Sequence, residues 1–172
     1  MMPTAPKIAL LTGGSRGLGR NAAIALSRKG IDVIITYHSR KDEADKVVKE
    51  MEDNGRQAAA LQLDTGDVSS FDAFVSRLAD VLKEKWNREQ IDILINNAGF
   101  GVHAPIAETT EEQFDRLLNV QLKGVFFLSQ KLYPHIADDG RVVNVSTGLT
   151  RFVIEGFGAY SAMKGAIEVL TK

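Results

Sequence analysis

A glycine-rich turn, TGGSRGLG at residues 12–19, follows the first apolar run of the chain, KIALLT at residues 7–12. Its glycines Gly13, Gly17 and Gly19 have a GxxxGxG spacing, and a helical pattern begins among them. Between a strand and a helix, such glycines allow a tight turn, close approach of the backbone to a pyrophosphate and close helix packing. Because a helix amino terminus offers unpaired N–H groups to an anion, the turn predicts a dinucleotide site; a merely flexible loop is the alternative.

The end of the second predicted strand indicates which dinucleotide is bound. NAD sites typically carry an acid about 20 residues after the glycines, which binds the ribose 2′-hydroxyl. Residues 36–40 here read TYHSR, without an acid. Arg16 and Arg40 could instead bind a 2′-phosphate, although most arginines are ordinary surface charges. The sequence therefore favours NADP(H), with NAD(H) as the second choice, and the predicted contacts are Gly13, Ser15, Arg16, Gly17, Leu18, Gly19, Tyr37, His38, Ser39 and Arg40.

The composition excludes several other classes of protein. The 172 residues are 44% hydrophobic, 25% charged and 7% aromatic, which are globular values that exclude disordered and fibrous chains. A net charge of −1 provides no large field to attract nucleic acid or an anionic membrane. Without cysteine, a disulfide scaffold, a thiolate zinc site and a cysteine nucleophile are excluded. The histidines are far apart, so no metal site is expected: His38, His103 and His135.

The chain shows no targeting or membrane signal. Residues 1–7, MMPTAPK, lack the apolar core of a signal peptide, and no window approaches the ~18 apolar residues of a membrane span. We therefore expect a cytoplasmic protein whose partner is a small molecule, not a membrane or a nucleic acid.

Strand-like and helical patterns alternate along the whole chain. Short apolar or β-branched runs predict strands at residues 7–12, 32–37, 57–63, 91–95 and 141–145. Apolar residues at helical spacing predict helices at residues 17–29, 40–54, about 71–86, 119–133 and 158–172, and another that opens at Thr109 or Thr110. Such alternation predicts right-handed βαβ units. The expected fold class is α/β, a doubly wound parallel sheet (Rossmann fold) in a single domain over residues 1–172.

Further motifs follow the glycine turn in a specific order. Asp64 follows the third strand, NNAG occupies residues 96–99, Asn119 lies in a predicted helix, and YSAMK occupies residues 160–164. With these motifs the sequence resembles the short-chain dehydrogenase/reductase family, in the compact branch that includes ketoacyl-carrier-protein reductase-like enzymes. The resemblance covers residues 7–172. It implies an NAD(P)H-dependent oxidoreductase that interconverts a carbonyl and a secondary alcohol by hydride transfer, with a tyrosine as proton donor.

The resemblance also implies a role for each motif. Tyr160 would donate or accept the proton. Lys164, one helical turn later on the same face, would stabilise the phenolate and hold the nicotinamide ribose. Asn119 would hold a water that relays protons to the lysine. The other implied contacts are that of Asp64 with the adenine and those of the NNAG motif with the cofactor, from Asn96, Ala98 and Gly99.

The catalytic hydroxyl is ambiguous between two neighbours. In the family a serine most often lies thirteen residues before the tyrosine, and that position here is Thr147. Thr147 can donate the same hydrogen bond; alternatively the loop has one extra residue and Ser146 keeps the role. Because strand alternation points the two side chains in opposite directions, only one of them faces the cleft. The spacing favours Thr147.

The chain ends at Lys172, whereas the resemblance implies two further strands and a substrate loop. We therefore expect a dinucleotide-binding domain that is incomplete at its carboxyl end, either as part of a longer molecule or without its substrate half. The resemblance also implies a homodimer or homotetramer through the helices that hold Asn119 and Tyr160. The alternative function is a non-catalytic NADP(H)-binding fragment or a nucleotide-binding sensor. An extended-branch epimerase is disfavoured, because its TGxxGxxG turn does not match residues 12–19.

Overall fold

The computed structural model describes residues 6–172. Residues 1–5, on which part of the signal-peptide expectation rests, lie outside the described residues. Five parallel strands form one sheet in the order β3-β2-β1-β4-β5. The strands are β1 (Ile8–Leu11), β2 (Asp32–Tyr37), β3 (Ala58–Gln62), β4 (Ile91–Asn96) and β5 (Ile136–Asn144). This strand order confirms the predicted α/β fold with a Rossmann-type parallel sheet.

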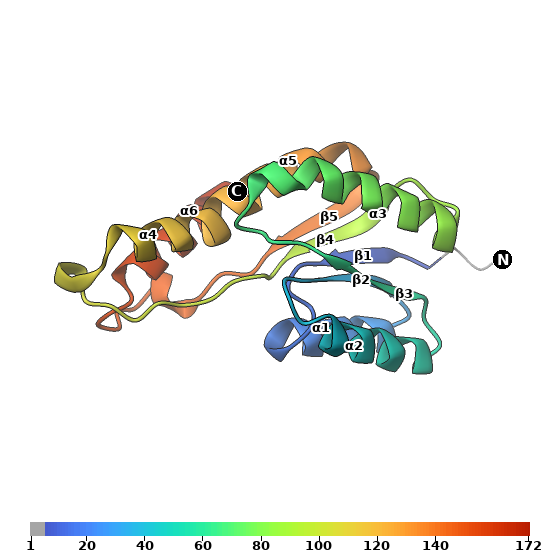
Figure 1. Cartoon of the computed structure of the whole chain (residues 1–172), viewed down its shortest axis with the longest axis horizontal. Helices are drawn as coiled ribbons and strands as arrows, with labels where there is room; N and C mark the ends of the chain where they lie inside the picture. The colour runs from blue at the N-terminus through green and yellow to red at the C-terminus, as the bar shows by residue number, and fades with distance from the viewer. Residues whose placement is uncertain (1–5) are drawn as a thin grey trace.

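Helices cover both faces of the sheet (Figure 1). On one face lie α1 (Gly17–Arg28) and α2 (Lys41–Asp53). On the other lie α3 (Phe71–Trp86), α5 (Gly124–Leu132) and α6 (Gly158–Leu170), with α4 (Glu111–Leu118) packed beside α6. Thr110 caps α4 and forms a reciprocal pair of hydrogen bonds with Gln113, so the predicted helix start is confirmed.

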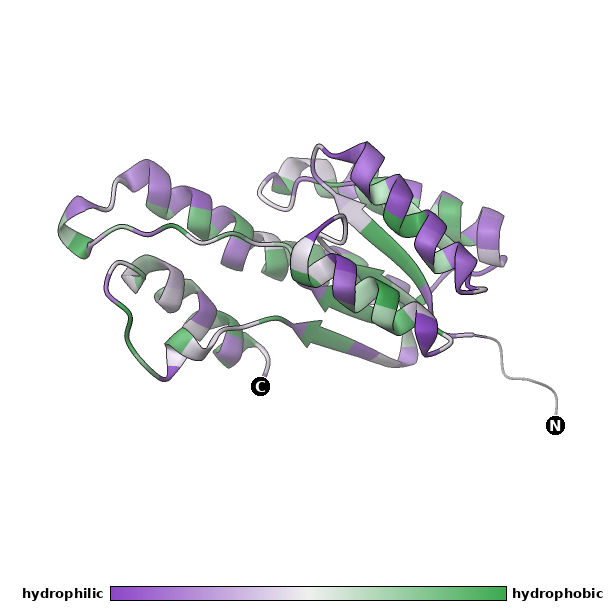
Figure 2. Ribbon diagram, turned by 90° about the horizontal axis from the view of Figure 1, so that it is seen from below, coloured by the Kyte–Doolittle hydropathy of each residue, from purple (hydrophilic) through white to green (hydrophobic). Residues whose placement is uncertain are grey.

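Two apolar layers separate the sheet from its helices. Side chains alternate along the central strands: Ile8 and Leu10 pack towards α3 and α5, whereas Leu11 packs towards α1 and α2. Every residue of β1 and β2 is buried, as their uninterrupted apolar runs predict for strands covered on both faces. Figure 2 shows the same pattern, with hydrophobic strands and helices whose hydrophilic faces turn outward. In the part of the chain described, no helix has the length and apolar character needed to cross a membrane.

The structure differs from the predicted elements in two places. The segment expected as one α-helix over residues 119–133 begins with a π-helical turn. This turn, Asn119–Lys123, lies between α4 and α5. In this turn the Gly124 N–H donates to the Asn119 carbonyl, five residues back. In addition, β5 begins at Ile136, not at residue 141, because a register shift between Ile91 and Ile93 lets β4 pair with this polar segment.

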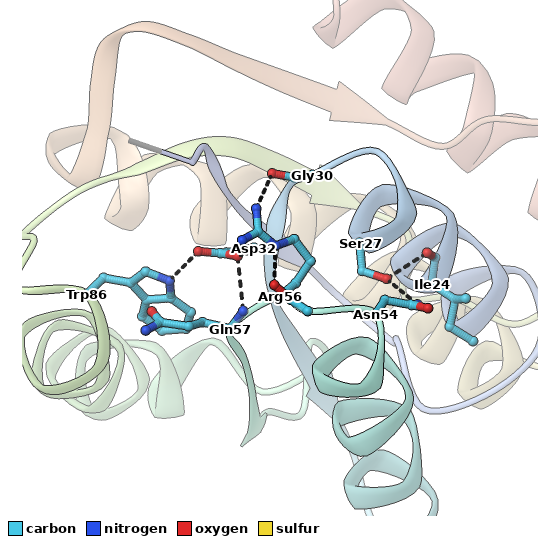
Figure 3. Close-up of polar contacts among 9 residues, drawn as sticks. Ile24, Ser27, Gly30, Asp32, Asn54, Arg56, Gln57 and Trp86 are labelled. Atoms are coloured by element: carbon cyan, nitrogen blue, oxygen red, sulfur yellow. Dashed lines mark hydrogen bonds and ion pairs between the residues drawn. The ribbon is translucent and has the colours of Figure 1, made fainter. Parts of the chain in front are cut away.

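Polar groups tie the elements together at the amino end of the sheet (Figure 3). Asp32, at the start of β2, is 2% exposed. Its carboxylate accepts hydrogen bonds from the Trp86 indole at 2.9 Å and the Gln57 backbone at 3.0 Å, and Arg56 lies 3.5 Å away. One buried carboxylate thereby joins β2 to the end of α3 and the segment before β3.

Asp92 plays the same part between the starts of β1 and β4. It accepts a hydrogen bond from the Ile8 backbone at 2.7 Å and from Arg88 at 2.8 Å. Burial opposes its ionisation, but these hydrogen bonds hold the pKa of Asp92 below its ordinary value.

Candidate functional site

The segments that follow all five strands surround a cavity of about 1020 Å³. Open parallel sheets bind ligands outside the carboxyl ends of their strands, where the strand order reverses, which here is between β1 and β4. The glycine turn after β1 borders the cavity from one side, and Tyr160 and Lys164 of α6 border it from another. The fold therefore brings the two halves of the predicted site into one space.

The glycine turn leaves its backbone open to the cavity. Gly13 and Gly17 have positive φ angles of +70° and +56°, which glycine adopts without strain. A side chain at Gly19 would collide with the Gly13 carbonyl, so α1 can approach the turn this closely only with glycine there. The first turn of α1 has neither a side-chain cap nor an acid. Its N–H groups are therefore available to an anion.

Thr12 and Asn97 hold this turn in place, although neither was predicted as a site residue. The Asn97 side chain donates to the Thr12 carbonyl at 2.8 Å. The Thr12 hydroxyl accepts from the backbone of Asn97 at 3.0 Å and of Ala98 at 2.9 Å. The polar end of the first apolar run and the second asparagine of NNAG were the available signals. These bonds attach the glycine turn to the end of β4.

The two arginines predicted to bind a 2′-phosphate lie in different settings. Arg16 lines the cavity, whereas Arg40 does not and forms a 2.8 Å ion pair with Glu43 in the first turn of α2. His38 and Asp64 also line the cavity, with His38 Nε2 3.4 Å from the Asp64 carboxylate. The other predicted cofactor residues that line the cavity are Gly13, Ser15, Gly17, Leu18, Gly19, Ala98 and Gly99.

Besides Arg40, three predicted cofactor residues do not line the cavity: Tyr37, Ser39 and Asn96. Tyr37 is buried in the apolar layer beneath α2. The Asn96 side chain is 4% exposed and donates to Asn144 at 2.8 Å and to Ser129 at 3.1 Å. Asn96 thus joins β4 to β5 and α5.

Tyr160 and Lys164 lie one turn apart on α6 and both line the cavity. Lys164 is 5% exposed, and its ammonium donates to the Val145 carbonyl at 2.7 Å. The same ammonium lies 5.9 Å from the centre of the Tyr160 ring. Burial lowers the pKa of Lys164, because removal from water disfavours the charged form. The pair combines a phenol with a cation that can release its proton more readily than a surface lysine.

Ser146 and Thr147 follow the last residue of β5 and lie in different surroundings. Ser146 lines the cavity beside Tyr160 and Lys164. Thr147 does not; it precedes a 3₁₀ turn, and its hydroxyl accepts from the Leu149 backbone at 3.4 Å. The Ser146 hydroxyl donates to Glu168 on α6 at 2.8 Å.

Gln121, in the π-helical turn, is a cavity residue that sequence reasoning missed. It is 1% exposed, and its amide nitrogen donates to the Phe100 carbonyl. Its Oε1 atom is buried and has no hydrogen-bond partner among residues 6–172. Asn119 also lines the cavity, two residues earlier. The available signal was a polar residue inside the apolar stretch of residues 120–128.

Aromatic residues connect two loops near Tyr160. The Phe157 ring packs edge-on against His103, with ring centres 5.3 Å apart, and against Tyr160 at 6.3 Å. The Ala104 N–H donates to the Gly156 carbonyl at 2.8 Å, so the loop after β4 is joined to the segment before α6.

Comparison with known proteins gives the same assignment as these residues. The family model for short chain dehydrogenase matches residues 7–172. A short-chain dehydrogenase/reductase of Pestalotiopsis microspora is 36% identical over 167 residues, which cover 96% of this chain and 61% of that protein. Versicolorin reductase stcU of Emericella nidulans is 32% identical, with the same shares covered. The chain thus spans about 61% of the length of these curated relatives.

Solved structures are equally similar. The angucycline C-6 ketoreductase LanV with bound NADP superposes with a TM-score of 0.92 at 36% identity, covering 95% of this chain and 64% of that one. The reductase LugOII, which catalyses keto-reduction in lugdunomycin biosynthesis, gives a TM-score of 0.91 at 36% identity, covering 96% and 68%. With the family model matched over residues 7–172, the chain belongs to the short-chain dehydrogenase family.

Proposed function

We propose that the protein is an NADP(H)-dependent oxidoreductase that interconverts a carbonyl and a secondary alcohol. The observation that carries this proposal is the single cavity bordered by both the glycine turn and the Tyr160–Lys164 pair. The turn suits a dinucleotide phosphate, and the pair suits a proton transfer in the same space. The relatives named as reductases and ketoreductases support the same activity.

The cavity fits NADP(H) on two independent grounds. A Cβ atom at Gly13 would collide with Ala98 and one at Gly19 with the Gly13 carbonyl, so the turn can adopt this form only with glycines there, and α1 begins without a cap or an acid. Arg16 at the cavity can bind a 2′-phosphate, and β2 ends without the acid that would favour NAD(H). When bound, the dinucleotide would supply or accept the hydride. The NADP held by the similar LanV structure supports this choice.

The residues of this chain would supply the proton and the positioning. In reduction, Tyr160 gives its hydroxyl proton to the carbonyl oxygen, and in oxidation it takes the proton from the alcohol. The Lys164 ammonium, held by the Val145 carbonyl, stabilises the phenolate that forms. Its lowered pKa lets it pass a proton back to Tyr160 more easily than an exposed lysine could.

We assign the hydroxyl that contacts the reacting oxygen to Ser146. Its position in the cavity lining supports this assignment, whereas Thr147 is occupied with the following turn. Ser146 lies fourteen residues before Tyr160, so the loop between them has one residue more than the common family spacing. The spacing argument for Thr147 stays as the competing prediction, and Ser146→Ala should reduce turnover more than Thr147→Val.

Two side chains are candidates to support proton relay beyond Lys164. Asn119, implied by the family resemblance, lines the cavity. Gln121 offers a buried acceptor, Oε1, without a protein partner among the described residues. A buried acceptor of this kind is usually paired with water or with a ligand, which supports Gln121 as the stronger candidate.

For the substrate we propose a ketone on or beside an aromatic ring system. Phe100 lines the cavity, and the Phe157 ring packs edge-on near Tyr160. Aromatic walls favour flat apolar ligands. Some relatives are named hydroxynaphthalene reductases, and a naphthalene is a fused aromatic ring. The expected homodimer or homotetramer and the cytoplasmic location stay predictions.

Turnover by the Tyr160→Phe variant is the direct test. We expect the wild type to oxidise NADPH in the presence of an aryl ketone such as α-tetralone. Loss of the phenolic proton should reduce kcat by about 10²–10⁴-fold, the usual contribution of a general acid. Binding of NADPH, measured by its fluorescence, should persist in the variant because the glycine turn is unchanged.

The same pair of proteins distinguishes the alternative function. A non-catalytic NADP(H)-binding protein would bind NADPH but turn over no faster than Tyr160→Phe on any ketone tried. Failure of the wild type to bind either NADPH or NADH would contradict the dinucleotide site itself.

A further inference from the structure

Arg116 is a charged residue of the cavity that the proposed chemistry does not use. It lies on α4, and its side chain lines the cavity together with Phe100. The guanidinium carbon lies over the Phe100 ring, 5.2 Å from its centre, which is the geometry of a cation–π contact. The aromatic ring thereby orients a planar cation at the wall of the cavity.

No acidic side chain among residues 6–172 pairs with this cation. Glu112 and Asp115 are close to Arg116 in the sequence of α4, but neither forms an ion pair with it. The acids of the cavity lining, Asp64 and Asp67, do not pair with it either and bond instead to the loop after β3. The fork of N–H donors on Arg116 is therefore available to an anion in the cavity.

Arg116 belongs to the part of the lining that the proposed function assigns to the substrate. Phe100 is one of the aromatic residues proposed to contact the ketone. In addition, α4 packs beside α6, the helix that holds Tyr160 (Figure 1). The cofactor phosphates have other binding groups, at the glycine turn and Arg16. The remaining cation over Phe100 therefore points to a negative charge on the substrate.

A substrate bound at this wall displaces water that stabilises the guanidinium charge. A neutral ketone offers nothing in exchange, whereas a carboxylate accepts two N–H bonds from the planar fork. We propose that Arg116 is a specificity-determining residue that selects aryl ketones carrying a carboxylate. This inference rests on the proposed function, because it takes Phe100 as part of the ketone site.

Two ligands of nearly equal size test this selection. One is α-tetralone with a carboxylate at ring position 6, and the other carries a neutral carboxamide at the same position. Calorimetry gives the Kd of each ligand for the protein with NADP⁺, a complex in which the ketone cannot be reduced. The wild type should bind the carboxylate about tenfold more tightly, as expected for a hydrogen bond between charged groups.

Substitutions at Arg116 should remove or reverse this preference. Arg116→Gln keeps a good helix former and removes the charge, so the two Kd values should lie within about twofold of one another. Arg116→Glu places a like charge beside the carboxylate and should make the carboxamide the tighter ligand. The matched control is Arg28→Gln, at an exposed arginine of α1 that does not line the cavity, and it should keep the wild-type ratio.

The Kd for NADPH separates this role from a contact with the cofactor. It should differ by less than about twofold between the wild type and Arg116→Gln, because the glycine turn and Arg16 are unchanged. Equal binding of both ligands by the wild type, or a tenfold preference that persists in Arg116→Gln, would overturn the inference. Weaker NADPH binding with an unchanged ligand ratio would assign the arginine to the cofactor and overturn it as well.

Turnover distinguishes this inference from the proposed function. A wild type that reduces both derivatives but binds them equally contradicts only the role of Arg116. A wild type that binds NADPH and prefers the carboxylate but reduces no ketone contradicts the proposed function, while the charge selection by Arg116 is confirmed.

Discussion

The two ends of the parallel sheet differ in how completely protein groups satisfy their polar side chains. At the amino end, Asp32 is buried and Asp92 is partly buried, and donors from neighbouring elements meet their carboxylates. These groups face no ligand cavity, and each joins segments that are distant in sequence. Their arrangement is that of structural groups, because a buried charge is tolerated when hydrogen bonds and counter-charges satisfy it.

At the carboxyl end, buried polar groups are only partly satisfied by protein. Lys164 is buried with the Val145 carbonyl as acceptor, and no carboxylate among residues 6–172 lies within ion-pair distance of it. Gln121 keeps an acceptor without a partner in the same part of the chain. The difference teaches that buried polar groups lack hydrogen-bond partners at the end of the sheet where a ligand could supply them.

Removal of Asp32 should produce the largest effect on stability. Asp32→Ala removes the buried acceptor of the Trp86 indole and the Gln57 N–H, and a hydrogen bond to a charged group contributes about 1.5–3 kcal/mol. We expect the free energy of unfolding to fall by about 2–4 kcal/mol, with kcat nearly unchanged below the melting range. Urea unfolding measures the first quantity, with Asp139→Ala, an exposed aspartate, as the control. A large loss of kcat in the folded variant would contradict the assignment of a purely structural role to the amino end of the sheet.

Arg16 and Arg40 allow a sharper comparison at the cofactor end. Arg16→Gln should weaken NADPH binding about 10- to 100-fold, the range for a hydrogen bond to a charged group, and NADH binding much less. Arg40→Gln should change either Kd by less than about threefold, because Arg40 pairs with Glu43 on the surface. Fluorescence titration gives all four values. Equal losses from both variants would restore the prediction that both arginines hold the phosphate.

The smallest expected effect is the dependence of stability on pH at Lys164. Burial lowers its pKa in the folded state, so the unfolded chain binds this proton more readily between the lowered pKa and the ordinary value of 10.5. Relative to Lys164→Met, the wild type should therefore gain stability as pH rises through that interval. Thermal melts of both proteins at several alkaline pH values measure the difference. A stability difference that is constant or reversed would show that burial does not disfavour the charged form of Lys164.

Much of the fold follows from local patterns in the sequence. The predicted strand at residues 32–37 coincides with β2, because the β-branched residues in this run strongly favour strands. The start of β5 was wrong because residues 136–140, IADDG, have little strand propensity of their own. That segment is a strand only because β4 lies beside it. The π-helical turn likewise has no local signature, since its residues form an ordinary helical pattern.

The predicted site shows the same limit. The order of the motifs in the sequence was enough to predict one site for the glycine turn, Tyr160 and Lys164, and all of them line one cavity. Counting residues favours Thr147, whereas the cavity lining supports Ser146, because the backbone after β5 decides which side chain faces the cavity. The Glu168 contact depends on how α6 packs against that end, and no spacing rule contains this information.

The strand order also has a consequence for the timing of folding during synthesis. The strands β1, β2 and β3 are neighbours in the sheet, and all three lie within the first 62 residues. The glycine turn can thus rest on Thr36 while the ribosome is still making α3. Its second support, Asn97, arrives with β4, and α6 follows later in the chain. A nascent chain would therefore acquire the glycine turn well before Tyr160 and Lys164.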